Sequence, residues 1–132
     1  MTNRYSNYPP RIYIAGPMRG KPDFNYPAFD EASRMLSSLG WDTVNPAQLD
    51  RDAGVDLEKV DPIRPVPNRL LREVFKRDLS SLCDCDAIYL LPGSENSLGA
   101  VVESDLAKLL GLAIYDYRDQ MSDIRQTTDN PR

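Results

Sequence analysis

The sequence predicts a single α/β domain in which a parallel sheet lies between two layers of helices. Short β-rich apolar runs alternate along the chain with longer segments whose apolar residues recur at helical spacing. A strand at residues 11–15, a helix from residue 26 and a strand at residues 41–45 have the spacing of a parallel crossover unit. We therefore expect a three-layer sandwich whose parallel strands follow a flavodoxin-like, Rossmann-like order around the first strand.

The first half of the chain contains a strand, a loop, a helix and a second strand. Residues 11–15 are rich in aromatic and β-branched side chains and run into a Gly-Pro pair, which indicates a buried strand. A loop continues to about Asn25. The helix predicted from Tyr26 ends before Gly40, because glycine is common just after a helix end. Residues 41–45 are predicted to form the second strand, which a proline ends.

The second half repeats the alternation after a stretch without a clear pattern. Residues 46–67 have no period, since four prolines interrupt a charged segment, and they are interpreted either as a lid or as an irregular spacer. Helices are predicted over residues 68–83 and 99–110. Strands are predicted at residues 86–91 and 112–116, and a polar loop precedes the last helix.

Outside the domain at residues 11–116 lie an N-terminal extension, residues 1–10, and a polar C-terminal tail, residues 117–132. The tail has no period, so we expect it either to be disordered or to order on a partner. No apolar run approaches the roughly 20 residues of a membrane span, and the extension lacks the apolar core of a signal peptide. Cys83 and Cys85 are too few for a disulfide scaffold. We expect a cytoplasmic protein that does not bind membranes.

The composition excludes several classes of function. Sixteen lysines and arginines stand against 20 aspartates and glutamates, which gives a net charge of −4 and argues against binding of a nucleic-acid polymer. The chain has no histidine, which excludes Ser-His-Asp and Cys-His catalysis and HExxH metal sites. Any catalysis must use carboxylates, tyrosine, lysine, cysteine or backbone dipoles.

Two acidic residues fall on the apolar stripes of predicted helices. Asp78 lies four residues before Leu82, and Glu103 lies three residues before Leu106. An acid on such a stripe faces the sheet, where it is either paired or used in chemistry. Each acid also has a structural interpretation. Asp78 can belong to a buried ion pair with an arginine such as Arg77, and Glu103 can stabilise the helix dipole.

The loops that follow the first and third strands are the expected ligand sites of this fold. Ser94, Ser97 and Gly99 are suited to a backbone nest for a phosphate at a helix N-terminus, although serine and glycine are also ordinary loop residues. The segment Gly16–Gly20 is either a tight turn or a surface that a ligand approaches closely, with Arg19 as an anion partner.

Three segments resemble the nucleoside 2-deoxyribosyltransferase superfamily, especially its 2′-deoxynucleoside 5′-phosphate N-hydrolases and related phage-encoded domains of unassigned function. The resemblance spans about residues 11–116. Its parts are the strand-one signature Ile12–Gly20, the acid-bearing Arg77-Asp78-Leu79 followed by Cys85–Ile88, and Ser97–Glu103. The last part is the most specific, since it resembles the Ser-x-Gly-x-x-x-Glu pattern of the phosphate-dependent N-hydrolases.

The resemblance implies a role for each matching residue. Glu103 would attack the anomeric carbon, Asp78 would assist departure of the base, and Tyr13 would line the sugar pocket. A carboxylate can stabilise or trap the positive charge that develops on the sugar, so neither a metal nor a cofactor is implied. The residues implied to contact the substrate are Gly16, Met18, Arg19, Gly20, Asn25, Ser97 and Gly99.

The leading functional hypothesis is therefore an N-glycosidase that hydrolyses a (deoxy)nucleoside 5′-monophosphate. Ser97, two residues before Gly99, favours a phosphorylated substrate and thus hydrolysis. One alternative is base exchange by a nucleoside 2-deoxyribosyltransferase, and another is a non-catalytic nucleotide-binding module. The expected partners are a small nucleotide or nucleoside and, by resemblance, further copies of this chain in a homodimer or higher homo-oligomer.

Overall fold

The computed structural model describes residues 9–55 and 68–126. Within these residues the core is one parallel sheet of four strands in the order β2-β1-β3-β4. The strands are β1 (Arg11–Ala15), β2 (Asp42–Val44), β3 (Ala87–Leu90) and β4 (Ala113–Asp116). The strand order reverses between the neighbouring strands β1 and β3, which is the flavodoxin-like arrangement. The predicted fold class is confirmed.

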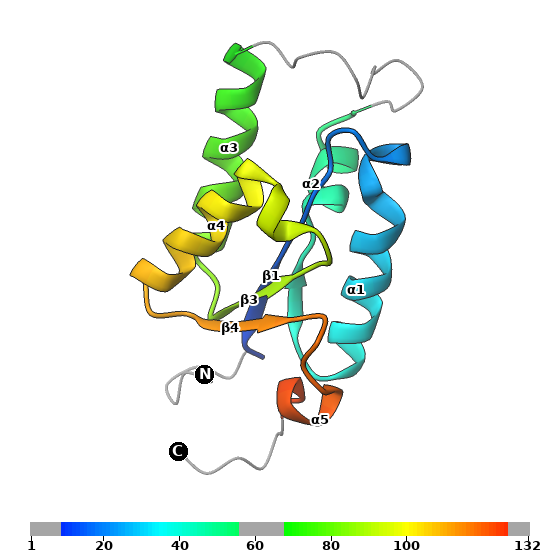
Figure 1. The fold of residues 1–132 in the computed structure, drawn as a ribbon, viewed down its shortest axis with the longest axis vertical. Helices are drawn as coiled ribbons and strands as arrows, with labels where there is room; N and C mark the ends of the chain where they lie inside the picture. Colours follow the sequence, from blue (N-terminus) through cyan, green and yellow to red (C-terminus); the bar gives the residue numbers. More distant parts are fainter. Residues whose placement is uncertain (1–8, 56–67, 127–132) are drawn as a thin grey trace.

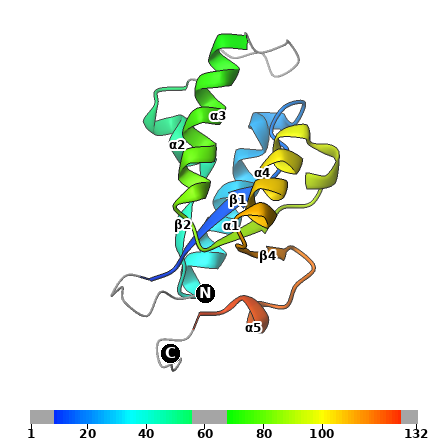
Figure 2. The same ribbon diagram turned by 90° about the vertical axis from the view of Figure 1, so that its left-hand side faces the viewer.

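Helices cover both faces of the sheet (Figure 1). Turned by 90°, the molecule shows α3 and α4 in front of the strands and α1 behind them (Figure 2). The described helices are η1 (Pro22–Asn25), α1 (Tyr26–Ser38), α2 (Pro46–Asp52), α3 (Asn68–Cys83), η3 (Ser94–Asn96), α4 (Leu98–Leu109) and α5 (Met121–Ile124). None of the helices in the described part of the chain is long and apolar enough to cross a membrane.

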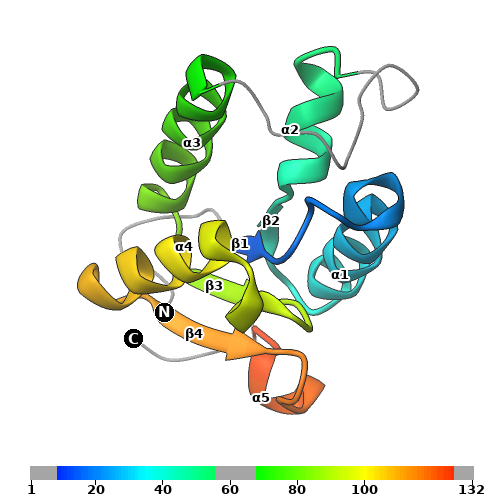
Figure 3. The same cartoon turned by 45° about the horizontal axis from the view of Figure 1, so that its top comes forward.

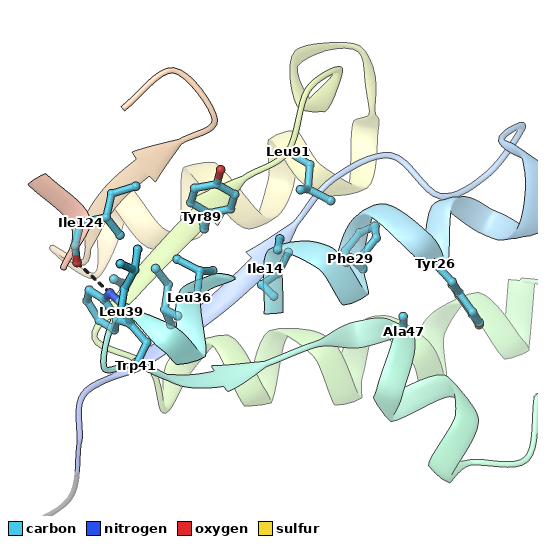
Figure 4. Packing of buried hydrophobic residues seen from close by; sticks show 13 residues of the cluster. Ile14, Tyr26, Phe29, Leu36, Leu39, Trp41, Ala47, Tyr89, Leu91 and Ile124 are labelled. Atoms are coloured by element: carbon cyan, nitrogen blue, oxygen red, sulfur yellow. Dashed lines mark hydrogen bonds between the residues drawn. The ribbon is translucent and has the colours of Figure 1, made fainter. Parts of the chain in front are cut away.

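Alternation along β1 divides the core into two clusters. Ile12 and Ile14 face α1 and pack with its buried residues, which include Phe29 (Figure 4). Tyr13 and Ala15 face the opposite side, where the other cluster contains residues of α3 and α4. Successive side chains of a strand point to opposite faces of a sheet. Tyr13 is therefore buried on the same side as the two helices that carry the predicted acidic residues.

Most predicted elements coincide with the observed ones. The helix over residues 68–83 has the predicted bounds, and the helix predicted over residues 99–110 begins and ends one residue earlier. Gly40 and Gly111 follow α1 and α4 with φ of 98° and 74°, a left-handed conformation that favours glycine. The polar loop predicted before α4 contains the single short turn η3.

The stretch 46–67 begins with a helix that the sequence analysis did not predict. Asn45 caps α2, since its side chain accepts a hydrogen bond from the amide of Ala47, and Pro46 occupies the first turn. An Asn-Pro pair of this kind is a helix start signal, because proline needs no hydrogen-bond partner there. The interpretation of residues 56–67 as a lid or spacer lies outside the described residues.

Part of the polar C-terminal segment packs on the core of its own chain, whereas the sequence led us to expect either disorder or ordering on a partner. Ile124 of α5 is 1% exposed, and its carbonyl accepts a hydrogen bond of 2.8 Å from the Trp41 indole (Figure 4). The amide of Gln126 donates to the carbonyl of Leu39. Helix α5 lies beside β4 (Figure 3). One buried isoleucine and two hydrogen bonds hold this segment against the core, although its composition suggested no regular structure. Residues 127–132 lie outside the described range.

Candidate active site

A buried pair of side chains joins β1 to α4. The hydroxyl of Tyr13 donates a hydrogen bond of 2.6 Å to Oε2 of Glu103. Tyr13 is 0% exposed and Glu103 is 6% exposed. Tyr13 lies in the middle of β1, at the strand reversal, where β1 pairs with β3. The two residues are 90 positions apart in the chain, so the fold creates their contact.

The sequence of α4 explains how a carboxyl group reaches the sheet. The buried residues of this helix are Ala100, Glu103 and Ala107, which lie on one face because residues three and four apart are neighbours on a helix. The two small alanines permit close approach of the helix to the strands. Gly99 permits close approach of α4 to α3, because a Cβ atom at this position would lie 2.8 Å from Cζ of Phe75.

Burial controls the protonation of this pair. Removal from water raises the pKa of Glu103 to about 7, since burial disfavours the charged carboxylate. The Tyr13 hydrogen bond acts in the opposite direction, and the nearby charge of Asp78 raises the pKa further. Burial and the negative charge of Glu103 raise the pKa of Tyr13 well above its usual value. Tyr13 therefore remains a donor, while Glu103 changes its charge near neutral pH.

Asp78 of α3 completes a cluster with Tyr13 and Glu103. It is 7% exposed, and its Oδ1 atom lies 2.8 Å from both Nε and Nη2 of Arg77. Burial raises the pKa of Asp78 to about 6, although the Arg77 guanidinium lowers it. The charge of Asp78 also raises the pKa of both other members. The three residues predicted as catalytic are thus brought together, and the predicted ion pair of Asp78 with Arg77 is present as well.

The cluster continues to two residues that the sequence analysis missed. Nη2 of Arg77 also lies 2.7 Å from Oδ1 of Asp50, at the end of α2. The second oxygen of Asp50 accepts a hydrogen bond of 2.5 Å from the hydroxyl of Tyr26, the first residue of α1. Asp50 lies in a stretch without periodicity, so no sequence signal placed it near Asp78. The sequence analysis used Tyr26 only as the first residue of its predicted helix.

The loop after β1 contains five of the predicted substrate-binding residues, and their described contacts are within the protein. A Cβ atom at Gly16 would lie 2.8 Å from the Leu91 side chain. The Asn25 side chain donates a hydrogen bond of 2.9 Å to the carbonyl of Pro17. Gly20 has a φ of 79° and adopts a turn conformation suited to glycine. Met18 packs on the core, and Arg19 is exposed.

This loop also contains a left-handed turn built without glycine. Asp23, Phe24 and Asn25 have φ of 52°, 51° and 62°. A left-handed conformation costs roughly 1–2 kcal/mol per residue for L-amino acids, and somewhat less for Asp and Asn. Such local strain persists where the surrounding structure fixes the backbone, which is common near ligand sites. The loop after β1 is therefore a defined surface at the carboxyl end of the central strand.

The start of α4 carries the other two predicted substrate-binding residues. Ser97 caps this helix, because its Oγ accepts a hydrogen bond from the amide of Ala100 at 3.3 Å. The hydroxyl of Ser94 is buried and donates a hydrogen bond to the carbonyl of Leu91. Gly99 packs against Phe75, as described above. Ser97 lies six residues before Glu103, which is fewer than two helical turns.

A cavity of about 510 Å³ lies between the start of α1 and the end of α2. Its lining residues do not include Tyr13, Asp78 or Glu103. One of its lining residues, Tyr26, is joined to Asp78 by contacts through Asp50 and Arg77. The lining consists of Asp23, Tyr26, Pro27, Asp30, Arg51, Gly54 and Val55. Among the residues that the structure describes, no group of three or more Cys, Asp or Glu side chains is arranged to hold a metal ion.

Comparison with known proteins adds a family and a fold relative. Comparison with curated proteins gave no match. Among solved structures, the chain is similar to a 2-deoxyribosyltransferase from the psychrotolerant bacterium Bacillus psychrosaccharolyticus, with a TM-score of 0.60 and 16% identity over 90% of this chain and 93% of that chain. At this identity the likeness is one of fold. Residues 10–116 match a family model described as a domain of unknown function, DUF4406, and the chain belongs to that family.

Proposed function

We propose that the protein is an N-glycosidase that hydrolyses the bond between base and sugar in a (deoxy)nucleoside 5′-monophosphate. The observation that carries this proposal is the buried carboxyl group of Glu103, which accepts a hydrogen bond of 2.6 Å from the Tyr13 hydroxyl and interacts electrostatically with a second buried acid, Asp78. Two carboxyl groups in different environments can divide the roles of nucleophile and acid between them. The fold shared with a 2-deoxyribosyltransferase supports chemistry at an anomeric carbon.

In the proposed reaction, Glu103 and Asp78 act on opposite ends of the bond that breaks. The Glu103 carboxylate forms a bond to the anomeric carbon while the carbon–nitrogen bond breaks and its electron pair leaves with the base. Asp78, protonated beforehand, transfers its proton to the departing base. Water then attacks the anomeric carbon and gives one proton back to Asp78. Glu103 leaves as a carboxylate, and the products are the free base and the sugar phosphate.

The 5′-phosphate is proposed to lie between the two loops at the carboxyl ends of β1 and β3. The first turn of α4 supplies backbone amide groups and the positive end of the helix dipole, both of which favour an anion. Ser97 and Gly99 begin that helix, and Arg19 supplies a positive charge from the other loop. The backbone of Gly16–Gly20 and the Asn25 side chain would border the sugar phosphate.

Base exchange is the second candidate, and the fold likeness to a 2-deoxyribosyltransferase is the observation that favours it. The first half of the reaction would be the same, because Glu103 would again take up the sugar. A second nucleobase, rather than water, would then attack the anomeric carbon. The two candidates differ in the acceptor alone, so an assay with and without an added base separates them.

The test is to incubate the purified protein with a panel of ribo- and deoxyribonucleoside monophosphates and to follow free base by chromatography. The proposal predicts base release without an added acceptor, and this release identifies the substrate. Product that forms only when a second base is supplied would establish base exchange instead. Thermal stabilisation by a nucleotide with no product in either arm would indicate a binding module and contradict the proposed catalysis.

We also propose that the protein forms a homodimer or a higher homo-oligomer. Helix α4 exposes an apolar stripe made of Leu98, Val102 and Leu109, whose exposed fractions are 81%, 43% and 81%. These residues lie on one side of the helix because they are four and seven positions apart. Burial of such a stripe against a second copy is favourable. Light scattering at micromolar concentration should give a mass above that of one chain, and a clean monomer would contradict this part of the proposal.

A further inference from the structure

We propose that Arg77 and Asp50 are positioning residues for Asp78. In this arrangement Asp50 anchors the guanidinium of Arg77, and Arg77 in turn fixes the orientation of the Asp78 carboxyl group and balances its charge. The catalytic meaning of this arrangement depends on the proposed function, in which Asp78 gives its proton to the leaving base. The positioning itself concerns the protein alone and can be measured without a substrate.

The geometry of Arg77 shows one guanidinium shared by two carboxyl groups. Its Nη2 atom lies 2.7 Å from Oδ1 of Asp50 and 2.8 Å from Oδ1 of Asp78, while its Nε donates to the same oxygen of Asp78 at 2.8 Å. The Asp50 and Asp78 side chains are 14% and 9% exposed. By contrast, the ion pair of Arg11 with Asp42 has side chains 52% and 49% exposed. The contacts of Arg77 are therefore stronger than the exposed ion pair, because water and salt screen exposed charges.

The need for an anchor follows from helix geometry. Arg77 and Asp78 are consecutive on α3, and consecutive helical side chains do not face each other. The Arg77 side chain must therefore curl around the helix to meet Asp78, an arrangement that a long flexible side chain does not keep unaided. Asp50 supplies the missing contact from α2. Asp50 is itself held by the hydroxyl of Tyr26, so α1, α2 and α3 all contribute to the anchor.

Asp78 interacts electrostatically with four charged or titratable groups from four elements. Arg77 belongs to α3, Asp50 to α2, Glu103 to α4 and Tyr13 to β1. Arg77 lowers the pKa of Asp78, whereas the negative charge of Asp50 raises it. Loss of the Arg77 charge and loss of the Asp50 charge should therefore move the pKa of Asp78 in opposite directions. These opposite signs follow from the two charges alone, so the anchoring by Asp50 is tested by removing its contact with Arg77 as well as its charge.

The experiment is a carboxyl ¹³C NMR titration of the free protein, with the Asp78 signal identified by its absence in Asp78→Asn. In Arg77→Met, the pKa of Asp78 should rise by about 1 or more, the usual effect of losing an adjacent opposite charge. In Asp50→Asn, the pKa should fall, because the amide oxygen still accepts the Arg77 contact while the repulsive charge is gone. Arg11→Met removes a distant surface arginine and should leave the pKa unchanged.

Arg77→Lys is the second variant, for use if Arg77→Met does not fold. Lysine keeps the positive charge but lacks the planar fork that reaches both carboxyl groups, so the pKa of Asp78 should rise by less than in Arg77→Met. Asp50→Ala removes the contact with Arg77 as well as the charge, so the pKa of Asp78 should be higher in Asp50→Ala than in Asp50→Asn. Equal pKa values in these two variants, or no shift in Arg77→Met, would overturn the proposal.

Base release then tests the catalytic meaning separately. The measured quantity is the ratio of the rate at pH 8 to the rate at pH 5. Compared with the wild type, this ratio should be higher in Arg77→Met and lower in Asp50→Asn, since the reaction uses protonated Asp78. Unchanged ratios alongside the opposite NMR shifts would contradict the acid role of Asp78. If the wild-type protein releases no base, the proposed function fails, while the titration still decides whether Arg77 and Asp50 position Asp78.

Discussion

Burial of the Glu103 carboxyl group couples the protonation of this group to the stability of the fold. In the unfolded chain this group ionises at its ordinary pKa of 4.5, whereas burial raises its pKa in the folded protein to about 7. The folded state therefore binds the proton more tightly than the unfolded state does. The stability that protonated Glu103 contributes is fully present below pH 4.5 and is lost as the pH rises through 7.

A stability measurement can detect this coupling without any substrate. Glu103→Gln cannot ionise, and its amide oxygen can still accept the Tyr13 hydrogen bond. We expect this variant to be more stable than the wild type by roughly 3 kcal/mol at pH 8, and nearly equal to it at pH 4. Urea unfolding at the two pH values measures the difference. An equal gap at both pH values would show that Glu103 is not destabilised by its charge.

Tyr13→Phe tests the partner of this carboxylate. Loss of the hydroxyl should raise the pKa of Glu103, because the Tyr13 hydrogen bond lowers it. If the reaction uses ionised Glu103, each unit of increase reduces the rate of base release below pH 6 about tenfold, while the rate above pH 8 changes little. The measurement is kcat/KM from pH 5 to 9. A loss that is the same at every pH would mean that Tyr13 does not act through the charge of Glu103.

At the level of residues, the sequence predicted which acidic side chains face the sheet but not which groups they contact. The apolar stripes placed Asp78 and Glu103 on the faces that pack towards the sheet, and both side chains are buried as expected. Tyr13 entered through resemblance alone, because no local pattern links residues 90 positions apart. The anchor at Asp50 was not foreseeable, since it depends on where α2 lies relative to α3.

At the level of elements, Gly99 is the point where α4 approaches α3. A methyl group at this position would meet the ring of Phe75 at 2.8 Å, closer than carbon atoms ordinarily pack. We expect Gly99→Ala to destabilise the protein by about 1–2 kcal/mol, since the ring or the helix must move. Urea unfolding measures the loss. The double variant with Phe75→Leu should recover part of it, and a Gly99→Ala protein as stable as the wild type would show that the ring yields freely.

Helix α5 depends on one buried side chain. Ile124→Ala should reduce the free energy of unfolding by about 2–4 kcal/mol, because the side chain is 1% exposed and leaves a cavity. Met121→Ala in the same helix is the matched control, since Met121 is 59% exposed and should cost less than about 0.5 kcal/mol. Both values come from denaturant unfolding. Equal losses in the two variants would mean that α5 is not held by Ile124.

At the level of the whole molecule, periodicity predicted the alternation of strands and helices, and connection rules then gave the strand order. The long helices and apolar strands have a pattern that local sequence reveals. The two α-helices that were missed among the described residues, α2 and α5, are short. Residues 46–52 were hidden by prolines, although Asn45-Pro46 carried a start signal. The docking of α5 depends on Trp41, 83 positions before Ile124, a contact that only the folded chain creates.

The central claim is that Glu103 performs the chemistry. The most direct test compares release of free base by the wild type and by Glu103→Gln, on a nucleoside monophosphate that the wild type cleaves. Because the variant is expected to be at least as stable at pH 7, loss of activity would not reflect unfolding. We predict a loss of at least about 10³-fold, in the range found when a nucleophile is removed. Base release by Glu103→Gln at the wild-type rate would contradict the account.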